Sequence, residues 1–521
     1  MSQMLKSSGA MGAATLTSRI LGLVREIVYA RFMGDGWVAG AFTLAFMVPN
    51  LFRRLLGEGA LTASFIPIFK EKEKLAGETE MWRAANAVIC GLVVSATILI
   101  ALGMLGISVA LLVGFKSGQT TLMLGLLRVM FPYVLLVCVA AIFMAMLNAR
   151  GHFFVPAMGA TMLNVVMIAS VLWLAPSLGL ELEQQIFGLA IGVVIAGVAQ
   201  AAFQWPLLRR EGYRFQWVSP LGDETVRRVV RQMIPGAIGV AAFQINVLIT
   251  QGFAFWVDAG VVASFNYAVR LMELPQGVFG ISLASFLLPT LSGLAAEKKY
   301  PEFRATLGQG VGYLVFLNLL ASALLFALAE PMVRLLFERG KFDSASTDRA
   351  ALALMCLAPG LVAFSVVNIL ARAFYALGDT RTPMRISMFC LALNAVLAAA
   401  LIWRFRQAGL GVANTLSALS NVALLVFALR KKLGQLQFTE LTRSLPGLCG
   451  AAVLAGGVAW GGAWWWTRNF GHASLAMRIG EVFAPMLAAT LVYGVVTMWL
   501  NIGHAREMFA LISARLKPRW S

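Results

Sequence analysis

The stretch from Ala84 to Val113, AANAVICGLVVSATILIALGMLGISVALLV, contains no charged side chain. A helix needs about 20 apolar residues to cross the hydrocarbon core of a bilayer, so this stretch is long enough to span one. Similar runs recur along the whole chain of 521 residues, of which 60% are hydrophobic and 13% are charged. A soluble domain is typically about half apolar and about a quarter charged. The sequence therefore predicts an all-α polytopic membrane protein without a large soluble catalytic domain.

Apolar runs that end at charges, Pro or Gly give fourteen expected transmembrane helices. Their limits are 9–32, 37–57, 84–113, 122–149, 153–176, 185–208, 232–256, 260–292, 306–329, 347–377, 383–404, 409–430, 444–467 and 476–501. Lys and Arg concentrate in alternate loops, and six arginines lie between positions 209 and 231. Cytoplasmic loops of membrane proteins carry such an excess. We therefore expect both termini in the cytoplasm, and the net charge of +18 does not indicate a nucleic-acid partner.

Two parts of the sequence repeat the same punctuating residues at a constant offset of 227 positions. The matched pairs are Pro132 and Pro359, Gly151 and Gly378, and Pro156 and Pro383. The offset corresponds to six expected spans, which predicts two six-helix lobes, 1–220 and 221–440, in a parallel repeat. Such repeats are related by an axis along the membrane normal, with a site where the lobes meet. Residues 441–505 then form two extra helices, and 506–521 form a cytoplasmic tail.

Arginines inside expected spans are the candidate binding residues. Arg19 and Arg25 lie in the first span and Arg270 in the eighth. A charge at such a depth is costly unless it meets a partner or a cavity. An ion pair with Glu26 or Glu273 is one explanation, and a cationic cavity is the favoured one.

Arginine outnumbers acidic residues within the expected spans, so a cavity there would be positive. The acids away from the ends of these spans are Glu26, Glu273 and Glu481. Guanidinium groups match phosphate oxygens in a bidentate way, so the predicted ligand is a pyrophosphate and not a cationic drug. Arg53 and Arg54 end the second span, where ordinary anchoring at the cytoplasmic surface explains them equally well.

The sequence lacks the residue patterns of disulfide-linked, metal-binding, enzymatic and ATP-hydrolysing proteins. The five cysteines form no CxxC motif and the three histidines are far apart, which predicts neither a disulfide framework nor a metal site. The sequence also lacks a cluster of carboxylates and histidines of the kind that a membrane enzyme would need, so we expect a transporter and not an enzyme. No GxxxxGK[ST] loop is present, so we expect an ion gradient, the membrane potential or the substrate gradient to supply energy.

Four segments resemble those of the bacterial lipid II flippase family MurJ, also called MviN. They are Ser18-Arg-Ile-Leu-Gly-Leu-Val-Arg-Glu26, Pro49-Asn-Leu-Phe-Arg-Arg-Leu-Leu-Gly-Glu58, Arg270-Leu-Met-Glu-Leu-Pro-Gln-Gly277 and Phe374-Tyr-Ala-Leu-Gly-Asp-Thr-Arg-Thr-Pro383. The last segment is shared with the wider multidrug/oligosaccharidyl-lipid/polysaccharide exporter superfamily. The resemblance extends over the whole chain.

This resemblance implies a fold and a transport function. The substrate would be lipid II, an undecaprenyl pyrophosphate carrying a disaccharide-pentapeptide, flipped from the inner to the outer leaflet of the cytoplasmic membrane by alternating access. Helices 13 and 14 would form a groove for its tail, and membrane lipids and cell-wall synthesis proteins would be partners. The alternatives are a flippase for another polyprenyl-pyrophosphate-linked oligosaccharide and a drug antiporter of the same superfamily.

By the same resemblance, individual residues acquire roles. Arg19, Arg25 and Arg270 match the essential cavity arginines, and Ser18, Arg53 and Arg54 match further binding positions. The expected supporting acids are Glu26, Glu58 and Glu273.

The chain departs from the family pattern at three places. Gly40 stands where members commonly have Asp, and Val269 stands where some have Asp. Members that bind sodium use acids on spans 7 and 11, whereas this chain offers Asn394 in span 11. The sequence therefore gives little support for sodium coupling.

Overall fold

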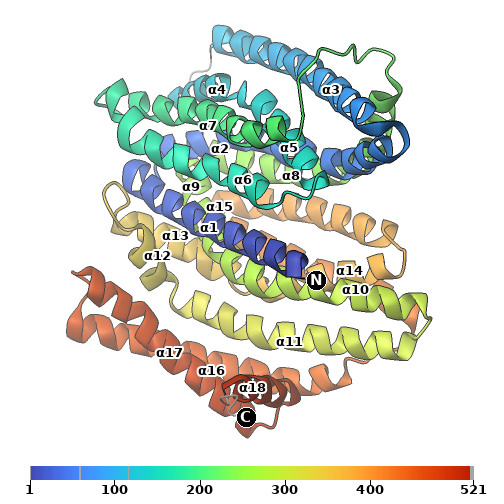
Figure 1. The fold of residues 1–521 in the computed structure, drawn as a ribbon. Coiled ribbons are helices and arrows are strands. Elements are labelled where there is room, and N and C mark those ends of the chain that lie inside the picture. The colour runs from blue at the N-terminus through green and yellow to red at the C-terminus, as the bar shows by residue number, and fades with distance from the viewer. Residues whose placement is uncertain (1, 58–59, 115–116, 517–521) are drawn as a thin grey trace. The chain divides into compact units, whose positions relative to one another are not determined.

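The computed structural model describes residues 2–57, 60–114 and 117–516 and contains no strand within these ranges. In chain order the first helices are α1 (Ser2–Met33), α2 (Trp37–Phe52), α3 (Ala60–Val113), α4 (Gly118–Met130), α5 (Tyr133–Ala149), α6 (Phe154–Ala169), α7 (Leu182–Arg210), α8 (Glu224–Val257) and α9 (Ala259–Pro275). The others are α10 (Ser282–Ala296), α11 (Tyr300–Ala327), α12 (Ala329–Phe337), α13 (Ser344–Leu357), α14 (Gly360–Ala376), α15 (Arg381–Leu433), α16 (Thr439–Phe470), α17 (Leu475–Trp499) and α18 (Gly503–Leu516) (Figure 1). Short π-helical turns are η1 (Arg53–Gly57), η2 (Ser170–Leu174) and η4 (Gln276–Ile281), and η3 (Pro176–Leu178) is a 3-10 turn.

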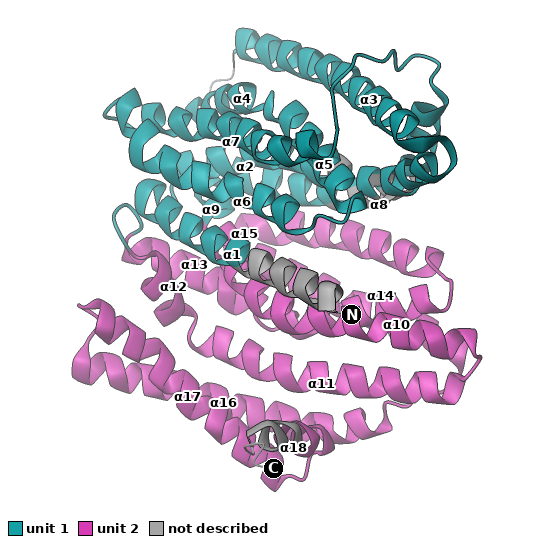
Figure 2. Cartoon of the chain, in the orientation of Figure 1, with its two compact units in different colours: residues 1–263, 339–342 teal, residues 264–338, 343–521 magenta. Residues whose placement is uncertain are grey.

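The chain divides into two compact units (Figure 2). Unit 1 comprises Met1–Ala263 and Arg339–Phe342, and unit 2 comprises Ser264–Glu338 and Asp343–Ser521. This division follows spatial proximity, whereas the expected boundary at 220/221 follows the sequence repeat. The division into two lobes, a helix pair and a tail stays a prediction, although α18 shows that the expected tail is helical as far as Leu516.

The structure confirms the predicted all-α membrane class, because it contains several helices that are long and apolar enough to cross a bilayer. Within the described residues, eight helices are long and apolar enough to cross a bilayer, or up to ten if two bent pairs count as one span each. The count of fourteen spans stays a prediction.

Helix α15 is interrupted near its middle. A straight helix of its 53 residues would be about 80 Å long at 1.5 Å per residue, far more than the roughly 30 Å of a bilayer core. Arg406 breaks it with a φ of 47°, and a Cβ at Gly409 would lie 2.7 Å from the carbonyl oxygen of Leu401. The hydroxyl of Ser417 donates to the carbonyl of Cys390 at 2.6 Å. The two segments therefore fold back on each other, as two separate spans would.

The matched prolines and glycines occupy the same places in two pairs of helices. Helices α5 and α14 have 17 residues each and begin directly after Pro132 and Pro359. Each makes a bend with the preceding helix, of 41° for α4 and α5 and 47° for α13 and α14. Gly151 and Gly378 follow them with φ of 89° and 73°, a left-handed conformation that glycine adopts without steric cost. The two pairs therefore share helix length, bend and the following glycine conformation, as the 227-residue offset predicts for them.

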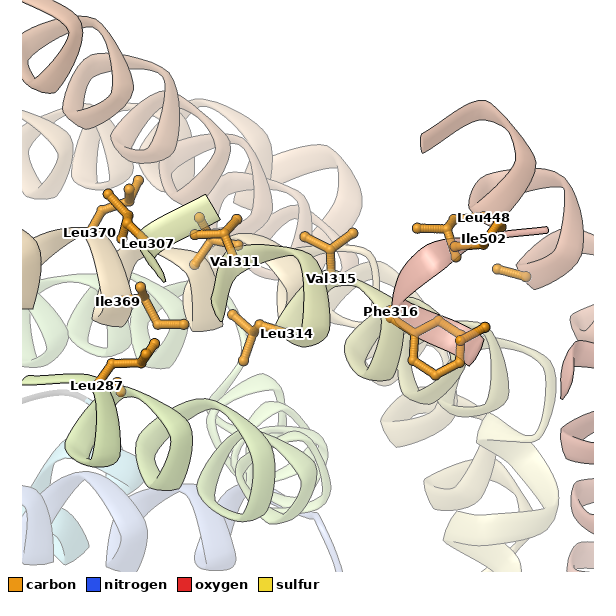
Figure 3. Close-up of a cluster of buried hydrophobic side chains, with 14 of the residues drawn as sticks. Leu287, Leu307, Val311, Leu314, Val315, Phe316, Ile369, Leu370, Leu448 and Ile502 are labelled. Carbon is orange, nitrogen blue, oxygen red and sulfur yellow. The ribbon is translucent and has the colours of Figure 1, made fainter. Parts of the chain in front are cut away.

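Close packing of small side chains and interlocking aliphatic ones holds unit 2 together. Figure 3 shows Leu287 of α10, Leu314 of α11 and Ile369 of α14 lying against one another in a buried cluster. On α16, every fourth residue from Ala451 to Ala463 is a buried alanine. Between helices in a membrane there is little hydrophobic driving force, so small residues that let backbones approach closely supply the packing energy.

The segment Arg339–Phe342 packs against the end of α1. The amide of Lys341 donates to the carbonyl of Arg31 at 3.0 Å. Gly34 and Gly340 both have a φ of 63°, and any side chain on either would collide with the opposite backbone. This contact belongs to unit 1, although the segment lies between α12 and α13 in the chain.

Candidate functional site

Arg25 of α1 is held by three neighbours within unit 1. Its Nη1 donates to Oδ1 of Asn164 on α6 at 3.0 Å, and its Nη2 pairs with Oε1 of Glu26 at 2.6 Å. Its guanidinium lies 5.5 Å from the centroid of the Tyr29 ring. The side chain is 13% exposed, and its Nε is buried without a hydrogen-bond partner among the described residues. A guanidinium fixed in this way has its orientation set before any ligand arrives.

Ser18 belongs to the same group through its backbone. Nδ2 of Asn164 donates to the carbonyl oxygen of Ser18 at 3.2 Å. Asn164 also lies close to Gly22, where an added Cβ would be 3.9 Å from this nitrogen, an ordinary van der Waals contact. The structure thus brings together Ser18, Arg25 and Glu26, which the sequence singled out.

Arg19 differs from Arg25 in its surroundings. Helix α1 is continuous from Ser2 to Met33, and six residues turn an ideal helix by about 600°, so the two side chains leave it in different directions. Arg19 is exposed, and no carboxylate in the described part of the chain forms an ion pair with it. Its hydrogen-bond donors are accessible.

Arg53 and Arg54 begin the π-helical turn η1 that follows α2. Nε of Arg53 donates to Oδ1 of Asn50 at 2.8 Å, and both arginines are half-buried. Glu58, which the sequence places after them, lies outside the described residues.

Arg270 of α9 pairs with Glu273 in unit 2. Its Nη1 donates to Oε2 of Glu273 at 2.9 Å, in the i,i+3 arrangement of a helix, and its side chain is 35% exposed. Helix α9 ends at Pro275, and η4 follows. The ion-pair alternative considered for Arg25 and Arg270 is therefore realised for both.

The third acid that the sequence places in a span is also paired. Glu481 of α17 is buried and accepts from Nη1 of Arg334 on α12 at 2.7 Å and from the hydroxyl of Thr467 at 2.9 Å. Arg478 donates to Oε1 of Glu338 at 3.1 Å. This network ties α12 to the α16–α17 pair, and it assigns Glu481 to a structural ion pair.

Three partners of the arginines were missed from the sequence. Asn164 is a single amide in the apolar run 153–176, Tyr29 is the one tyrosine in the sequence of α1, and Asn50 is adjacent to the Pro49 of α2. An isolated polar residue in an apolar run is a signal in itself, because such groups need partners in a membrane. The sequence does not say which helix supplies the partner.

The structure gives a reason for Gly40. A Cβ at this position would overlap with the carbonyl oxygen of Ala259, the first residue of α9. An aspartate, the residue common in the resembling family, therefore has no space in this conformation. Val269, the other departure, is half-buried on α9.

No group of three or more His, Cys, Asp and Glu side chains with metal-binding geometry occurs among the described residues. Asn394, the residue that the sequence offers for a cation in span 11, is buried in α15.

Comparison with known sequences gives one family. A family model described as lipid II flippase MurJ matches residues 29–481. The chain is 33% identical over 516 residues to a "Probable lipid II flippase MurJ" of Vibrio cholerae, an alignment that covers 95% of this chain and 97% of that protein. It is 32% identical over 488 residues to a "Lipid II flippase MurJ" of Burkholderia cenocepacia, which covers 92% of this chain and 93% of the other.

Solved structures with the same fold include several transporters. One titled "Lipid II flippase MurJ, inward closed conformation" has a TM-score of 0.76 at 20% identity and covers 94% of this chain and 99% of that chain. An inward-facing MATE family transporter has a TM-score of 0.66 at 13% identity, with coverage of 82% and 99%. An outward-facing one has 0.53 at 17%, with coverage of 84% and 96%. At these identities the likeness shows the fold alone.

Proposed function

Because the chain belongs to the lipid II flippase MurJ family, whose members are transporters and not enzymes, we propose that it flips lipid II from the inner to the outer leaflet of the bacterial cytoplasmic membrane. We propose alternating access as the mechanism, with both termini in the cytoplasm. Solved structures of the same fold include inward-facing and outward-facing transporters, which supports a cycle between two such states.

The proposed ligand contact is between arginines and the pyrophosphate of lipid II. The observation that carries it is the pair on α1: the guanidinium of Arg25 is held in one orientation by Asn164 and Glu26, and Arg19 is exposed without a described acid paired to it. Phosphate oxygens are strong acceptors for guanidinium donors, and charge-assisted bonds are about twice as strong as neutral ones.

Arg270 is proposed to complete a cationic cavity with the α1 pair. Its side chain is one-third exposed although it lies in a helix that is apolar enough to span a membrane. Arg53, Arg54 and Ser18 are proposed as further contacts. Glu26 and Glu273 limit the local positive charge and orient Arg25 and Arg270.

The remaining predicted features belong to the same proposal. Fourteen spans form two six-helix lobes, and α16 and α17 add a groove for the lipid tail. Energy comes from the membrane potential, an ion gradient or the substrate gradient.

Two alternatives differ from this proposal in substrate. A flippase for another polyprenyl-pyrophosphate-linked oligosaccharide would use the same arginines, because its lipid carries the same pyrophosphate. A drug antiporter of the superfamily is disfavoured by the sign of the charge, since arginines repel a cationic drug.

Rescue of a defined strain separates these substrates. The chain is expressed in a bacterium whose own lipid II flippase can be switched off, and in a second strain that lacks a flippase for another polyprenyl-pyrophosphate oligosaccharide. We expect lipid II to reach the outer leaflet in the first strain and no rescue of the second. Rescue of the second strain alone, at matched membrane levels, would assign the oligosaccharide instead.

A further inference from the structure

The connection between α7 and α8 exposes large apolar side chains next to arginines. We call residues Glu211–Asp223 the aromatic–basic loop. Phe215 is 50% exposed, Trp217 63% and Leu221 88%. Exposed aromatic side chains of this size are unfavourable in water unless another apolar phase covers them.

The loop is fixed at both ends against α3, so its exposed side chains are held in place. Tyr213 is buried and donates its hydroxyl to Oδ1 of Asn86 at 2.8 Å. Nδ2 of Asn86 in turn donates to the carbonyl of Arg214 at 3.0 Å. At the far end, Pro220 lies against Gly91, where an added Cβ would be 3.3 Å from its ring. In Figure 1 the chain between α7 and α8 runs as an extended segment past α3.

The position of the loop along α3 gives its depth. Arg83 is the last charged residue before the apolar run 84–113, and Tyr213 packs on its neighbour Trp82 with ring centroids 5.5 Å apart. Gly91 lies eight residues further, about 12 Å along a helix at 1.5 Å per residue. The loop therefore passes from the charged end of α3 to a level beside its apolar run. That level corresponds to the boundary between headgroups and acyl chains, where Trp and Tyr are enriched.

Basic side chains surround the aromatic ones and are mostly unpaired. Exposed arginines flank the loop on α7, within it and on α8; they are Arg209, Arg210, Arg214, Arg227 and Arg231. No described carboxylate forms an ion pair with any of them. Arg228, the sixth, pairs with Glu71 on α3 at 2.7 Å.

The acids of this region have other partners or stand apart. Glu211 accepts from Nε of Arg150 at 2.9 Å and contacts Nε2 of His152 at 2.8 Å. Asp223 accepts from the amides of Thr225 and Val226 and so caps α8. Glu224 lies exposed in the first turn of α8. A net positive surface therefore remains around Phe215 and Trp217.

We propose that the aromatic–basic loop, with Arg209, Arg210, Arg227 and Arg231, is a binding site for anionic phospholipids. The lipids belong to the leaflet that faces the loop. Phe215 and Trp217 enter the interfacial layer, and the guanidinium groups bind the headgroup phosphates. The bilayer is favoured over a soluble protein partner because the loop extends directly from the end of α7, a membrane-crossing candidate. The inference does not depend on which lipid the protein transports.

A spin label reports the depth of the loop directly. Gln216, which is exposed between the two aromatics, is replaced by cysteine and labelled with a nitroxide, after Cys356 and Cys449 have been changed to alanine. The full chain is placed in nanodiscs of phosphatidylcholine, with or without phosphatidylglycerol. Accessibility to oxygen and to a water-soluble nickel complex gives the depth. We expect the nickel accessibility to fall several-fold when phosphatidylglycerol is present.

A matched pair of variants tests whether the local arginines cause the shift. Arg209→Gln with Arg210→Gln removes two exposed cations from the last turn of α7, and Arg430→Gln with Lys431→Gln removes two from the last turn of α15. The first variant is expected to abolish the lipid-dependent shift and the second to retain it. If the first does not fold, Arg214→Gln with Arg227→Gln takes its place.

Three results would overturn the proposal. One is equal accessibility of the label in the two bilayers. Another is high nickel accessibility in both bilayers, which would leave the surface to a soluble partner. The third is an equal response of the α7 and α15 variants, which would show a general effect of charge.

Discussion

Asn164 connects Arg25 of α1 to helix α6 with two hydrogen bonds. It accepts from the guanidinium and donates to the carbonyl of Ser18. Replacement by alanine leaves a guanidinium N–H and a backbone carbonyl without these partners in a largely buried place.

We predict that Asn164→Ala destabilises the protein and reduces flipping. The cost of an unsatisfied buried polar group is about 1–3 kcal/mol, and the freed guanidinium loses its fixed orientation. Thermal unfolding in detergent measures the first effect, and outer-leaflet lipid II measures the second. Asn368→Ala is the control, because among the described residues the Asn368 amide donates to the carbonyl of Phe364, one turn earlier in its own helix. Equal transport by both variants would show that Asn164 does not support substrate binding.

Gly40 is predicted to tolerate no side chain. Gly40→Ala places a methyl group on the carbonyl oxygen of Ala259, and overpacking of this kind costs about 1–3 kcal/mol or more. We expect a clear fall in unfolding temperature and a still larger one for Gly40→Asp. Gly457→Ala serves for comparison, since Gly457 is also helical but has nothing within 4 Å of an added Cβ. A stable Gly40→Asp protein would show that α2 and α9 separate easily.

The arginines could be predicted from the sequence and their neighbours could not. An arginine in an apolar run is recognisable from the sequence alone, because a charge at that depth needs a partner or a cavity whichever helix supplies it. Asn164 is 139 positions from Arg25, and no local pattern joins the two. The close approach that requires Gly40 likewise depends on a backbone more than two hundred positions away.

At the level of helices, the junction between α14 and α15 depends on Asp379. Its carboxylate accepts from Nζ of Lys432 at 2.9 Å, from the amide of Thr382 at 3.0 Å and from the Thr382 hydroxyl at 2.8 Å. Lys432, followed by Thr382, lowers the pKa of Asp379 from 3.8 to about 2. A carboxyl whose pKa is lower in the folded state stabilises that state above its ordinary pKa and ceases to do so below the lowered one.

The pH dependence of Asp379→Asn follows from this. We expect the variant to unfold at a lower temperature than the wild type near neutral pH. The difference should shrink as the pH falls from 3.8 towards about 2, because the wild-type carboxyl is then protonated as well. Asp348→Asn, at an exposed aspartate of α13, is the comparison for loss of an acidic side chain elsewhere. A difference for Asp379→Asn that is independent of pH would assign the effect to helix capping and not to charge.

The start of α5 and α14 after a proline and the glycine that follows each helix follow well from sequence, because Pro and Gly act through the local backbone. Breaks inside long helices follow less well. Arg406 has a positive φ although arginine has no preference for it, and the tight return of α15 at Gly409 imposes that conformation. The π-helical turns η1 and η4 were not predicted at all, since they depend on how the adjoining segments pack.

For the transport cycle, we predict that flipping does not require sodium. The expected seventh span has no acid between Glu224 and Asp258, and the eleventh offers Asn394. A neutral amide and backbone carbonyls bind sodium weakly compared with carboxylates. Replacement of sodium by choline in cells that depend on this chain should leave outer-leaflet lipid II unchanged, and a fall that sodium alone restores would show coupling.

The class of the molecule was predictable from hydropathy and its family from four short motifs. The full-length match to MurJ relatives confirms the family. The number of spans and the arrangement of lobes are harder to predict from the sequence. Whether a helix that carries charges, such as α1, counts as a span depends on the partners that its charged side chains find. Those partners come from distant parts of the sequence.

The most direct test of the account is the dependence of flipping on the three arginines. Wild type, Arg19→Ala, Arg25→Ala and Arg270→Ala are compared at matched membrane levels in cells depleted of their own flippase, with outer-leaflet lipid II as the readout. Arg404→Ala, at an exposed arginine of α15, controls for loss of a positive charge. We predict that each of the three variants loses at least about tenfold in flipping, the equivalent of one strong charge-assisted contact, while Arg404→Ala retains it. A folded Arg25→Ala protein that exports lipid II at the wild-type rate would contradict the pyrophosphate site.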